Sequence, residues 1–203
     1  MSAFRRVLPL VAVVACGLAA CSTGIQAGDA TTGPGASSIT PPAPVTTTAP
    51  PLGPGVFGPG CDRLRGSLAA MTDLPVVRAA AASSVLGEWV EAVEAAHAAD
   101  PLDGAPALTV FAPVDAAFAA AGPSARRLPV LDYHVLDQRL DAAGLQRAAG
   151  AETRDSGGGP LAFGGSGTSL TVNGVPVLCG NIPTKNATLF VIGTVLTPGT
   201  IAG

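Results

Sequence analysis

The stretch that decides the fold class is Leu170-Thr171-Val172-Asn173-Gly174-Val175-Pro176-Val177-Leu178-Cys179. Before the Asn173-Gly174 pair, apolar and polar residues alternate with the period of two that is typical of a half-buried strand. Asn and Gly both tolerate a positive φ, so this pair predicts a tight hairpin turn into a second strand. On that second strand we expect one face to carry Val175, Val177 and Cys179.

Outside the hairpin, the sequence predicts one strand after it, one strand before it and a series of short helices. Leu189–Ile192 predicts a last strand, which Pro198 ends, and Leu108–Ala112 predicts a short earlier one. Apolar spacing and end signals predict helices from Asp62 to about Met71, after Asp73, from Gly87, from Asp115 through Phe118, and from Leu140 to Ala149. Asp115 is expected to cap the helix that it begins. Helices early and an antiparallel sheet late predict the α+β class.

In the helical region, two prolines predict where helices end and one apolar stripe predicts a packed helix face. Asp100-Pro101 is expected to stop the helix from Gly87, and Pro129 to end any helix beside it, because the α conformation is disfavoured before proline. Trp89, Val93 and His97 recur every four residues. This spacing predicts one packed stripe, on which His97 is half buried.

The N-terminus is organised like an export signal. Arg5 and Arg6 precede the apolar segment Leu8–Ala20, whose 13 residues are fewer than the roughly 20 needed to span a bilayer. Leu18-Ala19-Ala20-Cys21 resembles a bacterial lipobox, which implies a signal peptide at residues 1–20 and a diacylglycerol anchor, with palmitate among its acyl chains, on Cys21. The alternative is an ordinary secretory signal with an incidental cysteine.

Residues 21–56 predict a disordered, lipidated stalk. Thr, Pro, Gly, Ala and Ser dominate this segment, and it has no amphipathic period. Such a composition buries too little apolar surface to offset the entropy of ordering the chain. One folded domain is therefore predicted at residues 57–203.

Two of the four cysteines belong to the export signal, and the other two lie in the predicted domain. Cys16 leaves with the signal peptide and Cys21 is used for lipid attachment, so Cys61 and Cys179 remain as an even pair. Oxidising conditions outside the cytoplasm favour a disulfide between these two residues. Two buried free thiols are the alternative.

Three segments resemble the fasciclin-type domain family: Thr109–Phe118, then Leu131 with Tyr133-His134-Val135, and finally Asn186–Pro198. Gly58-Pro59-Gly60-Cys61, together with Val177-Leu178-Cys179-Gly180, is similar to the mycobacterial fasciclin-domain cell-surface lipoproteins and secreted immunogenic proteins, in which two cysteines pair in this arrangement. The resemblance implies a wedge of mainly antiparallel β-strands with packed helices, and a role in adhesion or surface interaction.

The central Tyr133-His134 segment is where the resemblance implies partner binding. For His134 the structural alternative is a buried imidazole with hydrogen bonds to its neighbours, which is the common arrangement in protein cores. A hydrolase needs a nucleophile within reach of a base, and Ser166 with Asp132 and His134 offers such a set. Thr168, however, breaks the Gly-x-Ser-x-Gly elbow around Ser166. We therefore expect a protein that is not an enzyme.

Charge and motifs exclude further classes of function. The net charge is −3 and no basic cluster is longer than Arg126-Arg127, so nucleic acid is not an expected partner. No Cys/His set has zinc spacing, and no phosphate-binding Gly-x-x-x-x-Gly-Lys sequence occurs. No metal or other cofactor is expected.

Together these features predict an exported lipoprotein, anchored in the membrane through Cys21 at the extracytoplasmic face and partly released to the exterior. Its domain is expected to contact a protein, matrix or cell-envelope partner. The alternative function is an extracytoplasmic carrier of a small apolar ligand, such as a lipid or glycolipid.

Overall fold

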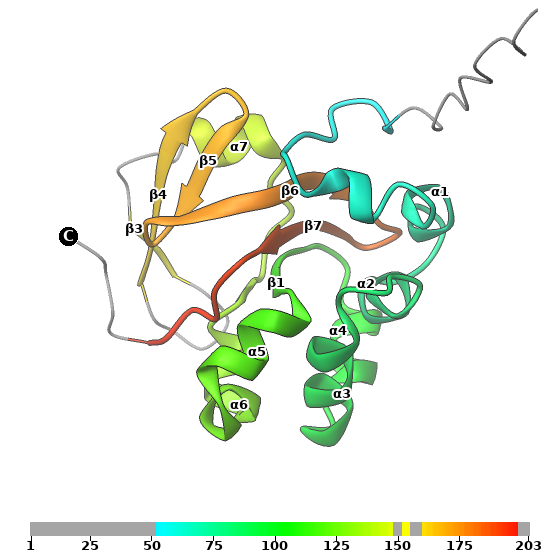
Figure 1. Ribbon diagram of the computed structural model, residues 1–203, viewed down its shortest axis with the longest axis vertical. Coiled ribbons are helices and arrows are strands. Elements are labelled where there is room, and N and C mark those ends of the chain that lie inside the picture. Colours follow the sequence, from blue (N-terminus) through cyan, green and yellow to red (C-terminus); the bar gives the residue numbers. More distant parts are fainter. Residues whose placement is uncertain (1–51, 148–151, 155–159, 199–203) are drawn as a thin grey trace, which may run out of the picture. The chain divides into compact units, whose positions relative to one another are not determined.

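The computed structural model describes residues 52–147, 152–154 and 160–198, all of which belong to one unit, Thr46–Gly203. In this part of the chain seven strands form one sheet in the order β2-β1-β7-β6-β5-β4-β3 (Figure 1). Only β1 and β7 pair in parallel, and the other neighbours are antiparallel. The bounds are Leu108–Pro113 for β1, Val135–Leu136 for β2, Glu152–Arg154 for β3, Pro160–Ser166 for β4, Ser169–Val172 for β5, Val175–Pro183 for β6 and Ala187–Ile192 for β7.

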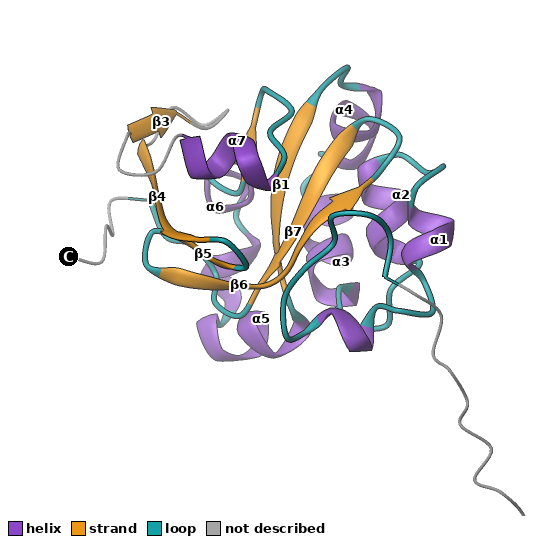
Figure 2. Cartoon of the chain, turned by 90° about the horizontal axis from the view of Figure 1, so that it is seen from above, coloured by secondary structure: helices purple, strands orange, loops and turns teal. Residues whose placement is uncertain are grey.

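Helices precede and interrupt these strands, which confirms the predicted α+β class. Figure 2 shows α1–α4 gathered on one side of β1 and β7, with β3–β5 and α7 on the other. The α-helices are Leu68–Met71 (α1), Val76–Ala81 (α2), Gly87–Ala95 (α3), Ala99–Gly104 (α4), Asp115–Ala121 (α5), Leu128–Asp132 (α6) and Ala142–Arg147 (α7), and the 3-10 helices are Cys61–Arg63 and Pro123–Arg126.

The central strands β1 and β7 are buried along their whole length because both faces of the sheet are covered. One face packs against α1–α5 and forms the helix-side cluster, to which β7 contributes Leu189 and Val191. The opposite face forms the strand-side cluster, to which the same strand contributes Phe190 and Ile192. The predicted alternation along this last strand is confirmed, although the strand ends at Ile192 and not at Pro198.

The strand-side cluster is built around aromatic rings. Phe111 of β1 is fully buried, and its ring centroid lies 5.6 Å from that of Phe190 and 5.9 Å from that of Phe163 on β4. Leu145 of α7 packs into the same cluster. The β3–β5 part of the sheet and α7 therefore cover apolar side chains that would otherwise face water.

The Asn173-Gly174 hairpin forms as predicted. Both residues have positive φ angles, 49° and 76°, and Val172 pairs with Val175 across the turn. The Asn173 side chain adds two contacts: its Oδ1 accepts from the Ala162 amide at 2.8 Å, and its Nδ2 donates to the Tyr133 hydroxyl at 2.9 Å. The turn residue thus ties the hairpin to the neighbouring strand β4 and to the segment after α6.

The prediction that Val175, Val177 and Cys179 share one face is wrong for the cysteine. Val175 and Val177 belong to the strand-side cluster, whereas Cys179 lies in the helix-side cluster. The pairing of β6 with β7 shifts by one residue between Val177 and Cys179, as in a β-bulge. An extra residue in one strand reverses the facing of the side chains beyond it.

Both expectations about proline are wrong. Pro101 lies in the first turn of α4, and Pro129 lies in the first turn of α6. The first turn of a helix tolerates proline because its amide groups have no partner within the helix. The helix α3 ends at Ala95 instead, and His97 adopts a positive φ of 56° beyond it. His97 is therefore exposed rather than half buried, while Trp89 and Val93 are buried as predicted.

Two other helix predictions need correction. The helix expected from Asp62 to Met71 is divided into a 3-10 helix and α1, with Gly66 between them, because glycine is a poor helix former. Asp115 begins α5, but its carboxylate does not cap this helix. Its Oδ1 accepts instead from the Glu88 amide in the first turn of α3, at 2.9 Å.

The signal peptide, Cys21 and most of the predicted stalk lie outside the described residues. The last part of that stalk is described, and Leu52 and Val56 pack against the helix-side cluster. No helix in the described ranges is both long and apolar enough to cross a membrane.

Candidate functional site

An open apolar groove of about 260 Å³ lies where the first 3-10 helix meets β6 and β7. Its apolar lining includes Leu64, Val85, Val114 and Leu178, and Arg63 contributes a charged side chain. Arg63 is exposed, whereas Leu64 is buried. The groove thus offers a contact surface that is mostly apolar, with one positive charge at its edge.

Backbone hydrogen bonds fix the wall of this groove. The Gly60 amide donates to the Leu178 carbonyl at 2.8 Å, and Phe57 exchanges two backbone hydrogen bonds with Gly180. Gly58 has a φ of 117°, and a Cβ atom at this position would lie 2.3 Å from the Leu178 oxygen. Glycine is therefore required where the N-terminal segment crosses β6.

The disulfide lies directly behind this wall. Cys61 and Cys179 are joined with an S–S distance of 2.02 Å and a Cα–Cα distance of 4.8 Å. Both cysteines are buried, with exposed fractions of 1% and 0%. The bulge in β6 allows this pairing, since it turns Cys179 toward the helix-side cluster that contains Cys61.

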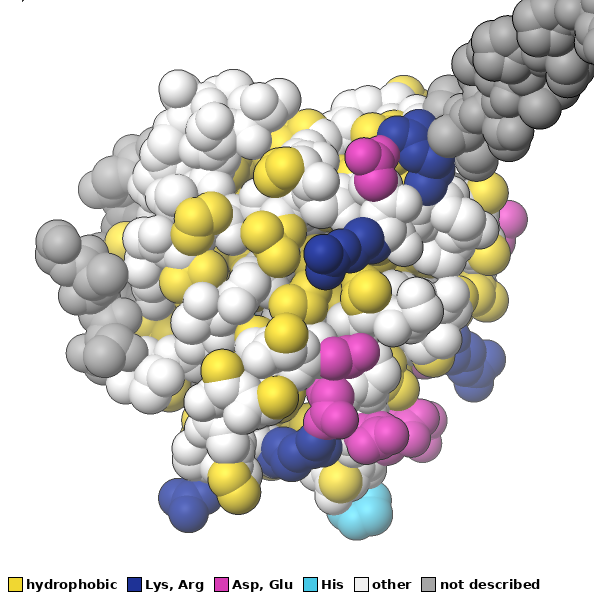
Figure 3. Space-filling view, in the orientation of Figure 1, with side chains coloured by type: hydrophobic (Ala, Val, Ile, Leu, Met, Phe, Trp, Pro, Cys, Tyr) yellow, Lys and Arg dark blue, Asp and Glu magenta, His cyan; other side chains and the backbone are white. Residues whose placement is uncertain are grey.

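Charged side chains lie beside the groove (Figure 3). Arg126 forms ion pairs with Glu88 and Glu91 of α3, and its guanidinium lies 5.8 Å from the centre of the Phe118 ring. Burial raises the pKa of Asp115, which caps α3 next to Val114. These charges are balanced locally, so Arg63 is the cation that the groove itself offers to a ligand.

Tyr133 and His134, the residues expected to bind a partner, are both 1% exposed. The His134 Nδ1 lies 2.6 Å from the Val130 carbonyl, and Nε2 accepts from the Leu196 amide at 2.9 Å. The ring is therefore the neutral tautomer with its proton on Nδ1. Because both side chains are used within the fold, we do not assign the partner surface to them.

The buried imidazole of His134 makes the stability of the domain depend on pH. Burial lowers its pKa from 6.5 to about 4, against the opposing effect of the hydrogen bond to Val130. The unfolded chain binds a proton near its ordinary pKa, whereas the folded chain binds one only near pH 4, so acid favours unfolding. We expect the free energy of unfolding to fall by about 2 kcal/mol between pH 7 and pH 5.

Urea unfolding followed by the fluorescence of Trp89, the single tryptophan, measures this dependence. The exposed His97 provides a matched control, because His97→Gln should retain the full decrease while His134→Gln abolishes most of it. An equal decrease in both variants would contradict the assignment to His134.

The alternative hydrolase set is not supported by this geometry. Ser166 lies exposed at the end of β4, where it pairs with Ser169 of β5. Both ring nitrogens of His134 are already hydrogen-bonded to backbone groups, so neither is available to accept a proton from a serine. Within residues 52–147, 152–154 and 160–198, no group of three His, Cys, Asp or Glu residues is placed to hold a metal ion.

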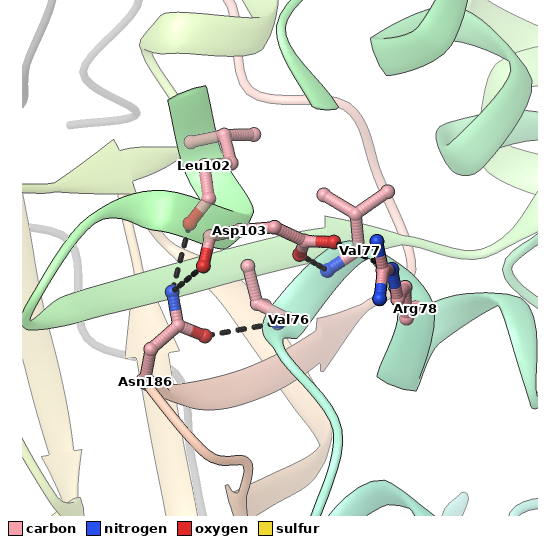
Figure 4. Close-up of polar contacts among 6 residues, drawn as sticks. All are labelled: Val76, Val77, Arg78, Leu102, Asp103 and Asn186. Atoms are coloured by element: carbon pink, nitrogen blue, oxygen red, sulfur yellow. Dashed lines mark hydrogen bonds and ion pairs between the residues drawn. The ribbon is translucent and has the colours of Figure 1, made fainter. Parts of the chain in front are cut away.

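Asn186, which immediately precedes β7, is a buried polar residue whose structural role the sequence did not indicate. Figure 4 shows its side chain between the start of α2 and the end of α4. The Oδ1 atom accepts from the Val76 amide at 2.9 Å, and Nδ2 lies within donating distance of the carbonyls of Leu102, Asp103 and Ala105, at 2.8, 3.3 and 3.0 Å.

Asp103 completes this arrangement, because its Oδ1 accepts from the Val77 amide at 2.8 Å and its Oδ2 lies 3.6 Å from the Arg78 Nε. The two side chains satisfy amide groups at the start of α2 that have no partner within that helix. Asn186 also begins an Asn-x-Thr sequon, but its buried and fully used amide fits a structural role. The sequence signals for it were this sequon and its position at the head of the closing segment.

Comparison with known proteins places this geometry in a family. A sequence profile of the fasciclin domain matches residues 84–198. The cell surface glycolipoproteins MPB83 of Mycobacterium bovis and MPT83 of Mycobacterium tuberculosis are each 31% identical over 220 aligned positions, covering 91% of this chain and 94% of each relative. Among solved structures, a FAS1 domain pair from the insect cell adhesion molecule fasciclin I is 17% identical with a TM-score of 0.44, over 55% of this chain and 45% of that one.

The profile match covers more than half of the chain and includes β1, the Tyr133-His134 segment and β7. These are the three segments on which the predicted resemblance depended, and the prediction is confirmed. The match begins after Cys61, so the first cysteine of the disulfide lies outside the region that the profile covers. The chain belongs to the fasciclin domain family.

Proposed function

We propose that this protein is an exported lipoprotein whose fasciclin domain binds a macromolecular partner at the cell surface. The observation that carries the proposal is the N-terminal pattern, in which Arg5 and Arg6, the apolar segment Leu8–Ala20 and the sequence Leu18–Cys21 follow one another ahead of a fasciclin domain. The relatives that share 31% identity are named cell surface glycolipoproteins. Their names support an extracytoplasmic location for this chain.

The proposed anchor is a diacylglycerol on Cys21, exposed as the new N-terminus when residues 1–20 are removed. Two acyl chains hold a protein at a membrane because each buried methylene contributes about 0.8 kcal/mol. The segment from residue 22 to the first described residues then separates the domain from the membrane. Partial release of the domain to the exterior requires only cleavage within this segment.

The anchor is tested by replacing each of the two cysteines in the N-terminal region. In cells fed labelled palmitate, we expect the wild-type protein to be labelled and to sediment with membranes. Cys21→Ala should lose the label and leave the membrane fraction, whereas Cys16→Ala should retain both properties, because Cys16 lies within the signal peptide. A labelled, membrane-bound Cys21→Ala protein would disprove the anchor.

For the domain itself, the groove is the surface that we propose for partner contact. Its apolar lining and the exposed Arg63 suit a protein segment that carries apolar side chains and a carboxylate. The disulfide and the Gly60–Leu178 hydrogen bond keep its wall rigid, so little ordering entropy is lost on binding.

A photo-cross-linking amino acid tests this surface in cells that produce the full-length protein. Placed at Arg63, it should capture one partner of defined mass, while at Arg127, an exposed arginine before α6, it should capture none. Equal products from both positions, or none from either, would contradict binding at the groove.

The carrier alternative is less well supported. Sites for drug-sized ligands usually have volumes of roughly 300–1,000 Å³, and the apolar groove, at about 260 Å³, is smaller and open to solvent. A whole acyl chain therefore fits poorly.

With both ring nitrogens of His134 hydrogen-bonded within the fold, we also propose that the protein is not an enzyme.

A further inference from the structure

A second hollow lies on the opposite side of the sheet from the groove, between α7 and β7. Its volume is about 370 Å³, within the range of roughly 300–1,000 Å³ typical of small-molecule sites. The lining residues are Arg139, Leu140, Asp141, Gly144, Arg147 and Thr188. Unlike the groove, this hollow is lined mainly by polar and charged side chains.

Among the described residues that line the hollow, positive charge predominates, with two arginines and one aspartate. Arg139 is held in place by two carbonyl groups, since its guanidinium donates to Thr184 O at 2.9 Å and to Lys185 O at 3.4 Å. Carbonyl groups position a guanidinium without neutralising it, and several of its five N–H donors stay available. Arg147, the last residue of α7, is exposed. Within the described ranges neither arginine forms an ion pair.

One carboxylate, that of Asp141, lines the same hollow. Its Oδ1 accepts from the Gly144 amide at 2.6 Å, so part of its accepting capacity is used within α7. Lys185, whose carbonyl accepts from Arg139, is exposed and does not line the hollow. The balance of charge therefore favours a negatively charged ligand, while Asp141 can accept hydrogen bonds from hydroxyl groups on that ligand.

Thr188 supplies an independent sign that the hollow receives a ligand. This residue of β7 is only 5% exposed, and its hydroxyl has no hydrogen-bond partner among the described residues. The indole nitrogen of Trp89 is the only side-chain nitrogen or oxygen of the described residues that is fully sealed without a partner. The unpartnered Thr188 hydroxyl is therefore not sealed, and Thr188 is one of the residues that line the hollow.

Thr109, the neighbour of Thr188 on β1, shows how a threonine hydroxyl at this position in the sheet can be hydrogen-bonded within the fold. Thr109 pairs with Thr188 across the parallel strands, and its hydroxyl donates to Gln138 O at 2.7 Å and accepts from the Leu140 amide at 2.8 Å. The Thr109 hydroxyl is hydrogen-bonded within the fold, whereas the Thr188 hydroxyl is not. Since buried polar groups usually have a partner, the Thr188 hydroxyl is available to bind a ligand.

We propose that this hollow binds the phosphate or carboxylate group of a hydroxylated small molecule, such as a sugar phosphate, a sugar acid or the polyol phosphate headgroup of a lipid. The guanidinium groups of Arg139 and Arg147 bind the anionic oxygens, a geometry to which arginine is suited. The Thr188 hydroxyl donates to the same group, and Asp141 accepts from a ligand hydroxyl. This site is separate from the groove and does not depend on the lipid anchor.

Calorimetric titration of the purified full-length protein at low salt tests the proposal with three probes: glucose 6-phosphate, glucuronate and neutral glucose. The two anionic probes should bind, and more weakly as salt is added, while glucose should not bind detectably. Arg147→Gln should weaken glucose 6-phosphate binding by about tenfold, the loss expected for one charge-assisted contact. The matched control Arg127→Gln should leave binding unchanged.

Two further variants keep the test independent of folding. Thr188→Val preserves shape while removing the hydroxyl, and Arg139→Gln removes the second cation; each should weaken binding while the Trp89 fluorescence still reports a folded protein. The proposal is overturned if the anionic probes bind no better than glucose, or if Arg147→Gln binds like the wild type.

A vesicle experiment with the Cys21→Ala protein distinguishes the source of the ligand. Binding to vesicles that contain phosphatidylglycerol, but not to phosphatidylcholine alone, with competition by glucose 6-phosphate, would identify a lipid headgroup. Binding of the soluble probes without any vesicle binding would identify a free sugar phosphate or sugar acid. Both outcomes retain the anion site.

Discussion

Replacing both Cys61 and Cys179 by alanine is expected to lower the free energy of unfolding by about 5 kcal/mol, the loop-closure entropy of a long covalent loop. The two cysteines are separated by 118 positions in sequence, so the bond restricts nearly the whole described chain when it is unfolded. Urea unfolding followed by Trp89 fluorescence measures the change as a lower midpoint. Since this loss is comparable to the total stability of many domains, part of the variant population should be unfolded without denaturant.

Reductant provides the control for this experiment. It should destabilise the wild-type protein by a similar amount, and it should leave the alanine variant unaffected because no bond is present to reduce. If reductant shifted the midpoints of both proteins equally, or neither, the disulfide would not be the cause.

Asn186→Ala is expected to cost about 4 kcal/mol, because it leaves several buried backbone groups without a hydrogen-bond partner. The amide of Val76 loses its acceptor, and the carbonyls at the end of α4 lose their donor. The effect should appear as a lower urea midpoint. Asn186 itself is only 8% exposed, so water does not readily replace the missing side chain.

Two variants distinguish this loss from a general effect of mutation near β7. Asn186→Asp retains the acceptor for Val76 but places a carboxylate against the carbonyls of Leu102 and Ala105, and it should also destabilise strongly. Lys185→Ala, at the exposed neighbouring position, should change stability by no more than about 0.5 kcal/mol. A mild effect of Asn186→Ala would show that the amide is not structurally important.

Much of the fold was predictable because its signals are local. The turn at Asn173-Gly174 depends on two residues that tolerate positive φ, and the alternation in β7 depends on side chains that point to opposite faces. The family was predictable for the same reason, since its characteristic segments are short and contiguous in sequence.

What could not be predicted depends on contacts between distant segments. The bulge in β6 follows from pairing with β7, and nothing in the sequence around Leu178 specifies it. Asp115 looked like a cap for the helix that it begins, yet it caps α3, whose first turn lies next to it only in the folded chain. The two prolines were misjudged because their position within a helix, first turn or interior, decides their effect.

The candidate sites also differ in whether local sequence or contacts between distant segments determine them. Tyr133 and His134 were identified from a short motif, but their burial is a property of the completed core. The hollow at Arg139 and Arg147 combines residues just before and within α7 with Thr188 on a strand much later in the chain. Neither motif spacing nor composition brings these side chains together, so sequence reasoning gave no indication of an anion site.

The one-residue register shift in β6 also makes the disulfide compatible with only one alignment of the strands. If β6 and β7 paired without the shift, the side chain of residue 179 would face the strand-side cluster, away from Cys61. The covalent bond therefore excludes the unshifted alignment and holds the native one in place.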